Sequence, residues 1–109
     1  MSNTFKVVGT GFLYAYRGGK FTVHEGQVLV RDGYHYSARF YVGERKFYQC
    51  SPVSGALEHS CVWLAERDDD KARDMFIQYE EKKIAQMKRD IDRRETIIKT
   101  IYKTKLIAL

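Results

Sequence analysis

The feature that most constrains the fold of this 109-residue chain is a long C-terminal stretch without glycine or proline. Neither residue occurs between Asp70 and Lys103. Isoleucine recurs there every seven positions, at Ile77, Ile84, Ile91 and Ile98. Glycine and proline are the residues that interrupt helices, and a seven-residue apolar spacing is typical of a helix that packs against another helix. The stretch therefore predicts one long helix with a narrow apolar stripe.

The predicted helix has two parts with different apolar surfaces. Its start carries a wider apolar surface, formed by Ala72, Met75, Phe76 and Tyr79. We expect this part to cover a sheet. Beyond Lys82 only a stripe remains, and its predicted partner or oligomer contacts are Ile84, Met87, Ile91, Ile98 and Ile101. Glu80 and Arg94 stand where a regular coiled coil has leucine, so we expect a short contact with a host protein or a second copy. The alternative is a helix that bends back onto its own sheet.

The charges change sign along the predicted helix. Residues 66–81 carry seven Asp and Glu against three Lys and Arg, whereas residues 82–109 carry nine Lys and Arg against three Asp and Glu. The helix dipole favours acids at the start of a helix and bases at its end. Asp68 or Asp69 is also a suitable N-cap residue. Both charged blocks thus have a local explanation, and the net charge of +5 does not by itself indicate a nucleic-acid partner.

The N-terminal part of the chain has the pattern of β-strands. Residues 5–64 hold twelve of the fifteen aromatic residues, and apolar positions tend to alternate. Turns or breaks are predicted at Gly9 and Gly11, at Gly18-Gly19, at Glu25-Gly26-Gln27, at Asp32-Gly33 and over residues 51–55. Five or six short strands predict an antiparallel, strongly bent sheet or small open barrel. The expected fold is α+β, with a β domain over residues 1–65 and the helix over residues 66–109 in a single structural domain.

No motif for catalysis or cofactor binding is visible. The histidines and cysteines lack the paired spacing of zinc sites, and no serine lies in a nucleophile-elbow sequence. No glycine-rich loop of the phosphate-binding type is present. We therefore expect a non-enzymatic protein with no cofactor and no metal. Cys50 and Cys61 are expected to be buried thiols, or else to face each other on neighbouring strands, where oxidation could link them.

Binding of single-stranded DNA or RNA is the alternative function. Proteins of that class combine stacking aromatic rings with basic side chains on a sheet face. The candidate contacts are Tyr14, Tyr16, Tyr34, Tyr36, Arg39 and Arg45. The competing explanation is that a small β domain needs bulky aromatic residues to fill its core.

The location of the protein is expected to be cytoplasmic. The first residues, Met1-Ser2-Asn3-Thr4, lack the basic and apolar regions of a signal peptide. No apolar run approaches the roughly 18 residues that a membrane-spanning helix needs, so no membrane association is expected.

Residues 62–101 carry a recognisable order of residue types. The segment reads Val62-Trp63-Leu64, Glu66-Arg67-Asp68-Asp69, Ala72, Phe76, Tyr79-Glu80 and Ile84, followed by a charged helix. In these features it resembles the C-terminal part of small accessory proteins encoded by phages and prophages. The resemblance implies a protein that binds a host protein in the host cytoplasm, as inhibitors of CRISPR nucleases and other defence systems do. It supplies no site residues.

Overall fold

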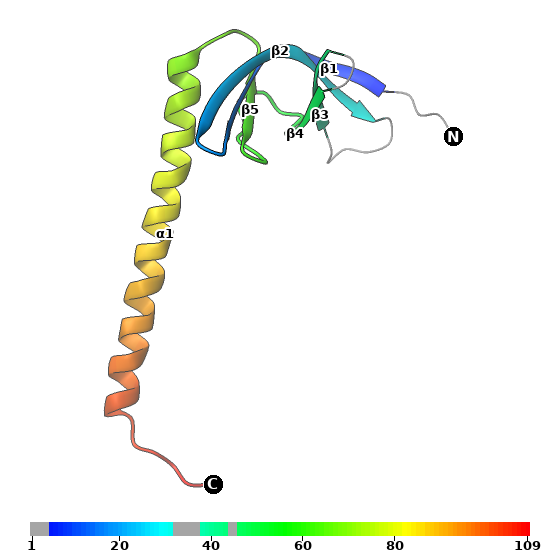
Figure 1. Ribbon diagram of the computed structural model, residues 1–109. Coiled ribbons are helices and arrows are strands. Elements are labelled where there is room, and N and C mark those ends of the chain that lie inside the picture. Colours follow the sequence, from blue (N-terminus) through cyan, green and yellow to red (C-terminus); the bar gives the residue numbers. More distant parts are fainter. Residues whose placement is uncertain (1–4, 32–37, 44–45) are drawn as a thin grey trace. The chain divides into compact units, whose positions relative to one another are not determined.

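The structure, a computed structural model, describes residues 5–31, 38–43 and 46–109. Its elements are β1 (Phe5–Arg17), β2 (Lys20–Arg31), β3 (Ala38–Val42), β4 (Lys46–Cys50), β5 (Cys61–Leu64) and α1 (Asp69–Lys103) (Figure 1). The strands form one antiparallel sheet in the order β4-β3-β2-β1-β5. The predicted α+β fold, an antiparallel sheet followed by one long helix, is confirmed.

The chain divides into two compact units, Met1–Phe76 and Ile77–Leu109. The first unit holds the sheet together with the first turns of α1. The second unit consists of the remainder of α1 and the residues that follow it.

Three glycines that predict turns lie instead inside long strands. Gly9 and Gly11 belong to β1, and Gly26 belongs to β2, so the predicted breaks at these positions are wrong. A Cβ atom on Gly26 would lie 2.0 Å from the carbonyl oxygen of Tyr41, and one on Gly9 would lie 2.4 Å from the indole of Trp63. Glycine is used here because another group approaches the strand closely.

The turn predicted at Gly18-Gly19 is present between β1 and β2. Both residues have positive φ angles, 58° and 77°, which glycine adopts without a clash of a Cβ atom. The turn predicted at Asp32-Gly33 lies outside the described residues.

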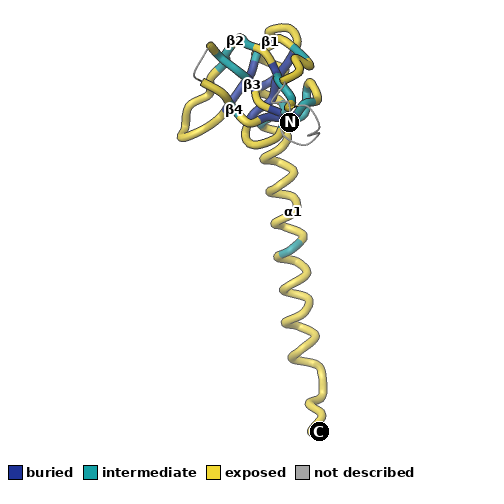
Figure 2. Tube along the Cα trace, turned by 90° about the vertical axis from the view of Figure 1, so that its right-hand side faces the viewer, coloured by how far each residue is buried: buried dark blue, intermediate teal, exposed yellow. Residues whose placement is uncertain are grey.

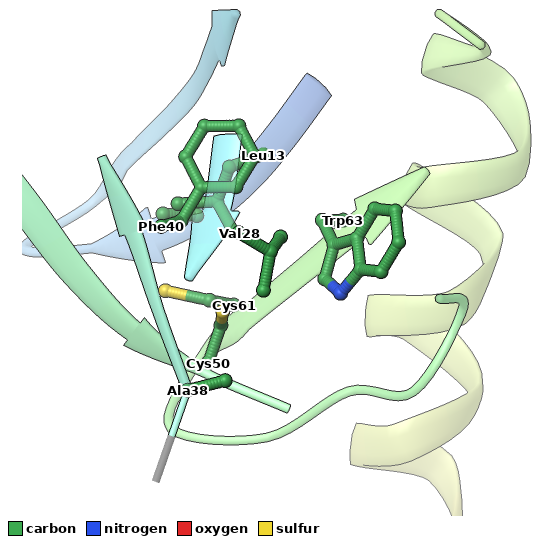
Figure 3. Packing of buried hydrophobic residues seen from close by; sticks show 8 residues of the cluster. Leu13, Val28, Ala38, Phe40, Cys50, Cys61 and Trp63 are labelled. Carbon is green, nitrogen blue, oxygen red and sulfur yellow. The ribbon is translucent and has the colours of Figure 1, made fainter. Parts of the chain in front are cut away.

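One face of the sheet forms a closely packed core. Its buried members are Leu13, Ala15, Val28, Ala38, Phe40, Cys50, Cys61 and Trp63 (Figure 3). β4 and β5 stand at opposite ends of the strand order, yet both contribute residues to this cluster. The indole N–H of Trp63 in β5 also donates a hydrogen bond to the carbonyl oxygen of Ser51, just after β4, at 2.9 Å. The sheet is therefore strongly bent, so that its two edge strands approach each other.

The two cysteines are buried free thiols of this core. They come from the two edge strands rather than from strands paired with each other. Burial raises the pKa of the Cys50 thiol to about 12. Burial also raises the pKa of Cys61, although Arg17, which donates to its sulfur at 3.4 Å, acts in the opposite direction. Since the thiolate is the reactive form, both groups are expected to react slowly with alkylating reagents at neutral pH.

The other face of β1 and β5 packs against the start of α1. Tyr14, Val62, Leu64 and Ala72 form a second buried cluster. Partly buried side chains surround it, namely Phe12, Val23, Leu57, Met75 and Phe76. Leu13 and Tyr14, which are adjacent in β1, thus serve different clusters, as the alternation of side chains along a strand requires.

The start of α1 is fixed by polar contacts with Tyr14. Asp68 is the N-cap, because its carboxylate accepts a hydrogen bond from the backbone N–H of Lys71 at 3.0 Å. The Tyr14 hydroxyl accepts from the backbone N–H of Asp68 at 3.0 Å and donates to Asp69 Oδ1 at 2.6 Å. Arg67 also donates to Asp69 Oδ1, at 3.1 Å. These contacts anchor the first helical turn to β1.

We expect Tyr14→Phe to destabilise the first unit by roughly 1–2 kcal/mol at neutral pH, since it deletes the hydroxyl and its hydrogen bonds but keeps the packed ring. Hydrogen bonds from Arg67 and then Tyr14 lower the pKa of Asp69. A lowered folded pKa gives stability that is present above the unfolded pKa, near 3.9, and is lost as the pH falls through the folded pKa.

Urea unfolding at several acidic pH values measures this effect. The loss of stability on acidification is expected to be smaller for Tyr14→Phe than for the native chain, and smaller still for Asp69→Asn, which also removes the contact with Arg67. Identical pH profiles for all three chains would show that the hydroxyl does not interact with the ionised carboxylate.

Candidate protein-interaction site

The second unit presents the apolar stripe of α1 to solvent. The five predicted contact residues are all about half exposed or more: Ile84 51%, Met87 60%, Ile91 54%, Ile98 53% and Ile101 67%. Ile77, at the start of the unit, is 49% exposed. Every residue of Ile77–Leu109 is exposed except Asp90, which is intermediate (Figure 2).

The spacing of these residues places them along one side of the helix. Residues three, four and seven positions apart lie on the same face of an α-helix. Ile84, Met87 and Ile91 therefore form one continuous apolar patch, and Ile98 and Ile101 form a second. Arg94 separates the two. Strict seven-residue spacing drifts by about 20° per repeat around a straight helix, which a slight supercoil around a second helix corrects.

Ile97 is an apolar neighbour of the stripe that the sequence reasoning missed. It is 48% exposed and lies four positions before Ile101, so it widens the second patch on one side. The adjacent pair Ile97-Ile98 was the signal that could have revealed it. Leu106 and Ile107, which follow the end of α1, are also exposed, at 94% and 76%.

Several polar side chains outside the stripe find partners within the helix itself. Gln86 donates to Asp90 Oδ1 at 3.2 Å, and Arg89 donates to Gln86 Oε1 at 2.6 Å. The hydroxyls of Thr96, Thr100 and Thr104 each donate to the backbone carbonyl four residues earlier. These contacts leave the apolar stripe as the surface that gains most free energy from a partner, because a single helix cannot bury its own apolar side.

Oppositely charged residues flank the first patch. Lys83 and Asp90 lie on one side of Ile84 and Ile91, and Glu81 and Lys88 lie next to Met87 on the other side. The Lys83 ammonium lies 4.4 Å from the centre of the Tyr79 ring. These four residues are placed where the flanking charges of a helix pair determine its orientation.

Of the predicted nucleic-acid contacts, the structure describes Tyr14, Tyr16 and Arg39. The structure contradicts the prediction that Tyr14 contacts nucleic acid. Tyr14 is only 2% exposed and its hydroxyl is bound to the start of α1, so its ring is not available to stack on a base. Tyr16 is 54% exposed, and Arg39 is exposed, with its guanidinium 4.7 Å from the centre of the Phe47 ring. Tyr34, Tyr36 and Arg45 lie outside the described residues.

The sheet also carries a small cluster in which Phe47, which was not among the predicted contacts, lies next to the predicted contact Arg39. Phe47 is 51% exposed, and its ring centre lies 5.9 Å from that of Tyr41. Arg39 completes this cluster on β3 and β4. The Phe47 ring thus lies beside both a guanidinium and a second aromatic ring.

The potential metal ligands of residues 5–31, 38–43 and 46–109 do not gather into a site. No group of three or more His, Cys, Asp or Glu side chains in these ranges is arranged to hold a metal ion. His24 instead stacks on Tyr48, with 5.2 Å between ring centres, and its Nε2 lies 3.1 Å from the Tyr48 hydroxyl. In the same ranges no helix is sufficiently long and apolar to cross a membrane.

Comparison with known proteins identified no relative of this chain. No family model, no curated protein and no solved structure matches the chain. The class that the structure defines is thus an α+β protein with an antiparallel sheet and one long C-terminal helix.

Proposed function

We propose that this chain is a non-enzymatic protein-binding module that binds its partner through the apolar stripe of α1. The observation that supports this most strongly is the exposure of Ile84, Met87, Ile91, Ile98 and Ile101 along one side of α1. Full burial of one such side chain contributes about 1.5–3 kcal/mol, so a helix pair of modest length gains enough to be stable.

The biological role that we propose is inhibition of a host defence system, such as a CRISPR nuclease, by a phage-encoded protein in the host cytoplasm. The resemblance of residues 62–101 to phage accessory proteins supports this role. The sequence pI of about 9.2 favours protein contacts over acidic imitation of DNA. Capture of binding proteins from a bacterial lysate, followed by mass spectrometry, would identify the host target.

Binding of single-stranded nucleic acid is the second candidate function. The observation that favours it is the cluster of Arg39, Tyr41 and Phe47 on β3 and β4, together with the exposed Tyr16. Aromatic rings beside a guanidinium can stack on unpaired bases without regard to sequence.

Salt dependence separates the two functions, because counterion release makes nucleic-acid binding fall steeply with added salt, whereas an apolar contact persists. The native chain would be studied at about 50 mM and about 500 mM salt. Light scattering would measure its self-association, and fluorescence anisotropy would measure binding of a labelled single-stranded oligonucleotide. We expect an assembly at both salt concentrations and no oligonucleotide binding at either. A monomer that binds the oligonucleotide at low salt only would instead support the second function.

A further inference from the structure

The charges beside the apolar stripe indicate which partner fits it. In a pair of helices the apolar residues of the two stripes meet in layers, and the residues next to the stripe face each other across the contact. In the seven-residue repeat that places Ile84 and Ile91 at position a, Lys83 and Asp90 occupy position g. Glu81 and Lys88 occupy position e. The sign of each cross-helix pair can therefore be worked out for each orientation.

A parallel pair of copies in register is unfavourable. In that arrangement each g residue faces the e residue five positions later in the other helix. Lys83 would then face Lys88, and Asp90 would face Glu95, so both pairs carry like charges. Glu80 and Arg94, at position d, would each also meet their own copy in the apolar layer.

An antiparallel pair reverses these relations, because g then faces g and e faces e. When Ile84 of one copy packs against Met87 of the other, Lys83 faces Asp90 and Glu81 faces Lys88. The two-fold symmetry repeats each of these favourable pairs. A like-charge pair, Asp74 with Glu95, occurs only toward the outer ends.

Shifting one helix of the antiparallel pair by one seven-residue repeat relative to the other removes the charge complementarity. Asp90 would then face Asp90 of the second copy, and Lys88 would face Lys88. Lys83 would face Ile97 instead of an acid. The register with Ile84 against Met87 is therefore favoured by the flanking charges.

The polar residues within the stripe are also easier to accommodate in this register. Glu80 and Arg94 lie in the layers outside the two central ones, opposite Ile91 and Ile77 of the second copy. The aliphatic part of an arginine can pack on isoleucine while its guanidinium reaches water. The central layers then contain only isoleucine and methionine.

From this charge pattern we infer that the occupant of the stripe is a second copy of this chain, bound as an antiparallel helix pair with Ile84 against Met87. The inference rests on the proposed function, since it names the partner of the same surface. Ile98 and Ile101 lie beyond the central layers of this pair.

A charge reversal at Lys83 tests the inference, since its effect differs in sign between the arrangements. Lys83→Glu would place an acid opposite Asp90 of the second copy twice per dimer, and we expect roughly tenfold weaker dimerisation by sedimentation. The double variant Lys83→Glu, Asp90→Lys restores opposite charges and is expected to recover native affinity. Lys82→Glu makes the same charge change away from the stripe and is the matched control, with helix content checked by circular dichroism.

Each other outcome overturns a defined part of the inference. Tighter dimerisation of Lys83→Glu would show a parallel pair, because the introduced acid would then face Lys88, and no change would show the shifted register. A native chain that is monomeric, but captures a different protein in a manner abolished by Ile91→Asp, would overturn the second copy and leave the proposed function intact. A chain that does neither would overturn both.

Discussion

Trp63→Ala is expected to lower the free energy of unfolding of the sheet by about 3–5 kcal/mol, the usual cost of deleting a buried large aromatic side chain. Trp63 is 6% exposed, and its ring packs over Gly9, where no Cβ atom could fit. Its N–H also supplies the hydrogen bond to the Ser51 carbonyl, which would be left without this donor. Because it connects β5 to the end of β4, its loss is expected to loosen the bend of the sheet.

Urea unfolding followed by tyrosine fluorescence measures the effect without depending on the deleted indole. Phe47→Ala is the matched control, since it also deletes an aromatic side chain from a strand but at a position that is 51% exposed. We expect this control to lose less than about 1 kcal/mol. Equal losses for the two variants would contradict a special role of Trp63 in closing the sheet.

Ile91→Asp is expected to weaken self-association by at least about a hundredfold, because each of the two copies loses the burial of an isoleucine. The new carboxylate would also face Glu80 of the second copy in the antiparallel pair. Ile91 belongs to the unit Ile77–Leu109, so the sheet is expected to keep its native stability.

Thr96→Asp provides the control for helix propensity and charge. It too replaces a β-branched residue by aspartate in α1, but Thr96 lies away from the stripe, and its hydroxyl donates to the carbonyl of Asp92 in the same helix. Its assembly, measured by light scattering, is expected to match that of the native chain. If both variants dissociate equally, helix weakening rather than the stripe would account for the loss.

Local sequence patterns were sufficient to predict the helix and its start. The absence of glycine and proline predicted α1, and the acidic residues before it predicted an N-cap at Asp68 or Asp69, of which the structure has Asp68. These features act within a few residues, so they can be recognised without knowledge of the rest of the fold.

The continuity of β1 and β2 was harder to predict, because the groups that require a glycine inside each strand are distant in sequence. Gly26 is required by the carbonyl of Tyr41 in the neighbouring strand, and Gly9 by the indole of Trp63. A glycine needed for close approach has the same local sequence as a glycine needed for a turn. The sequence alone therefore divided β2 at a position where it is continuous.

The role of Tyr14 illustrates the same difficulty at the candidate site. Side-chain alternation along a strand places Tyr14 on the sheet face opposite Leu13, but nothing local showed that the start of α1 would cover that face. Tyr14 consequently serves as an anchor for Asp68 and Asp69 rather than as a base-stacking residue. The stripe of α1 was predictable because its period is contained within one helix.

Hydrogen–deuterium exchange of the native chain at two protein concentrations would test most directly whether the stripe binds a second copy. An isolated helix end exchanges rapidly, whereas a helix paired with another is protected, and mass action makes that protection rise over about a hundredfold increase in concentration. We predict such a rise for the backbone amides of residues 80–94, with unchanged exchange in β1 and β5. Rapid exchange of residues 80–94 at both concentrations would contradict the helix pair.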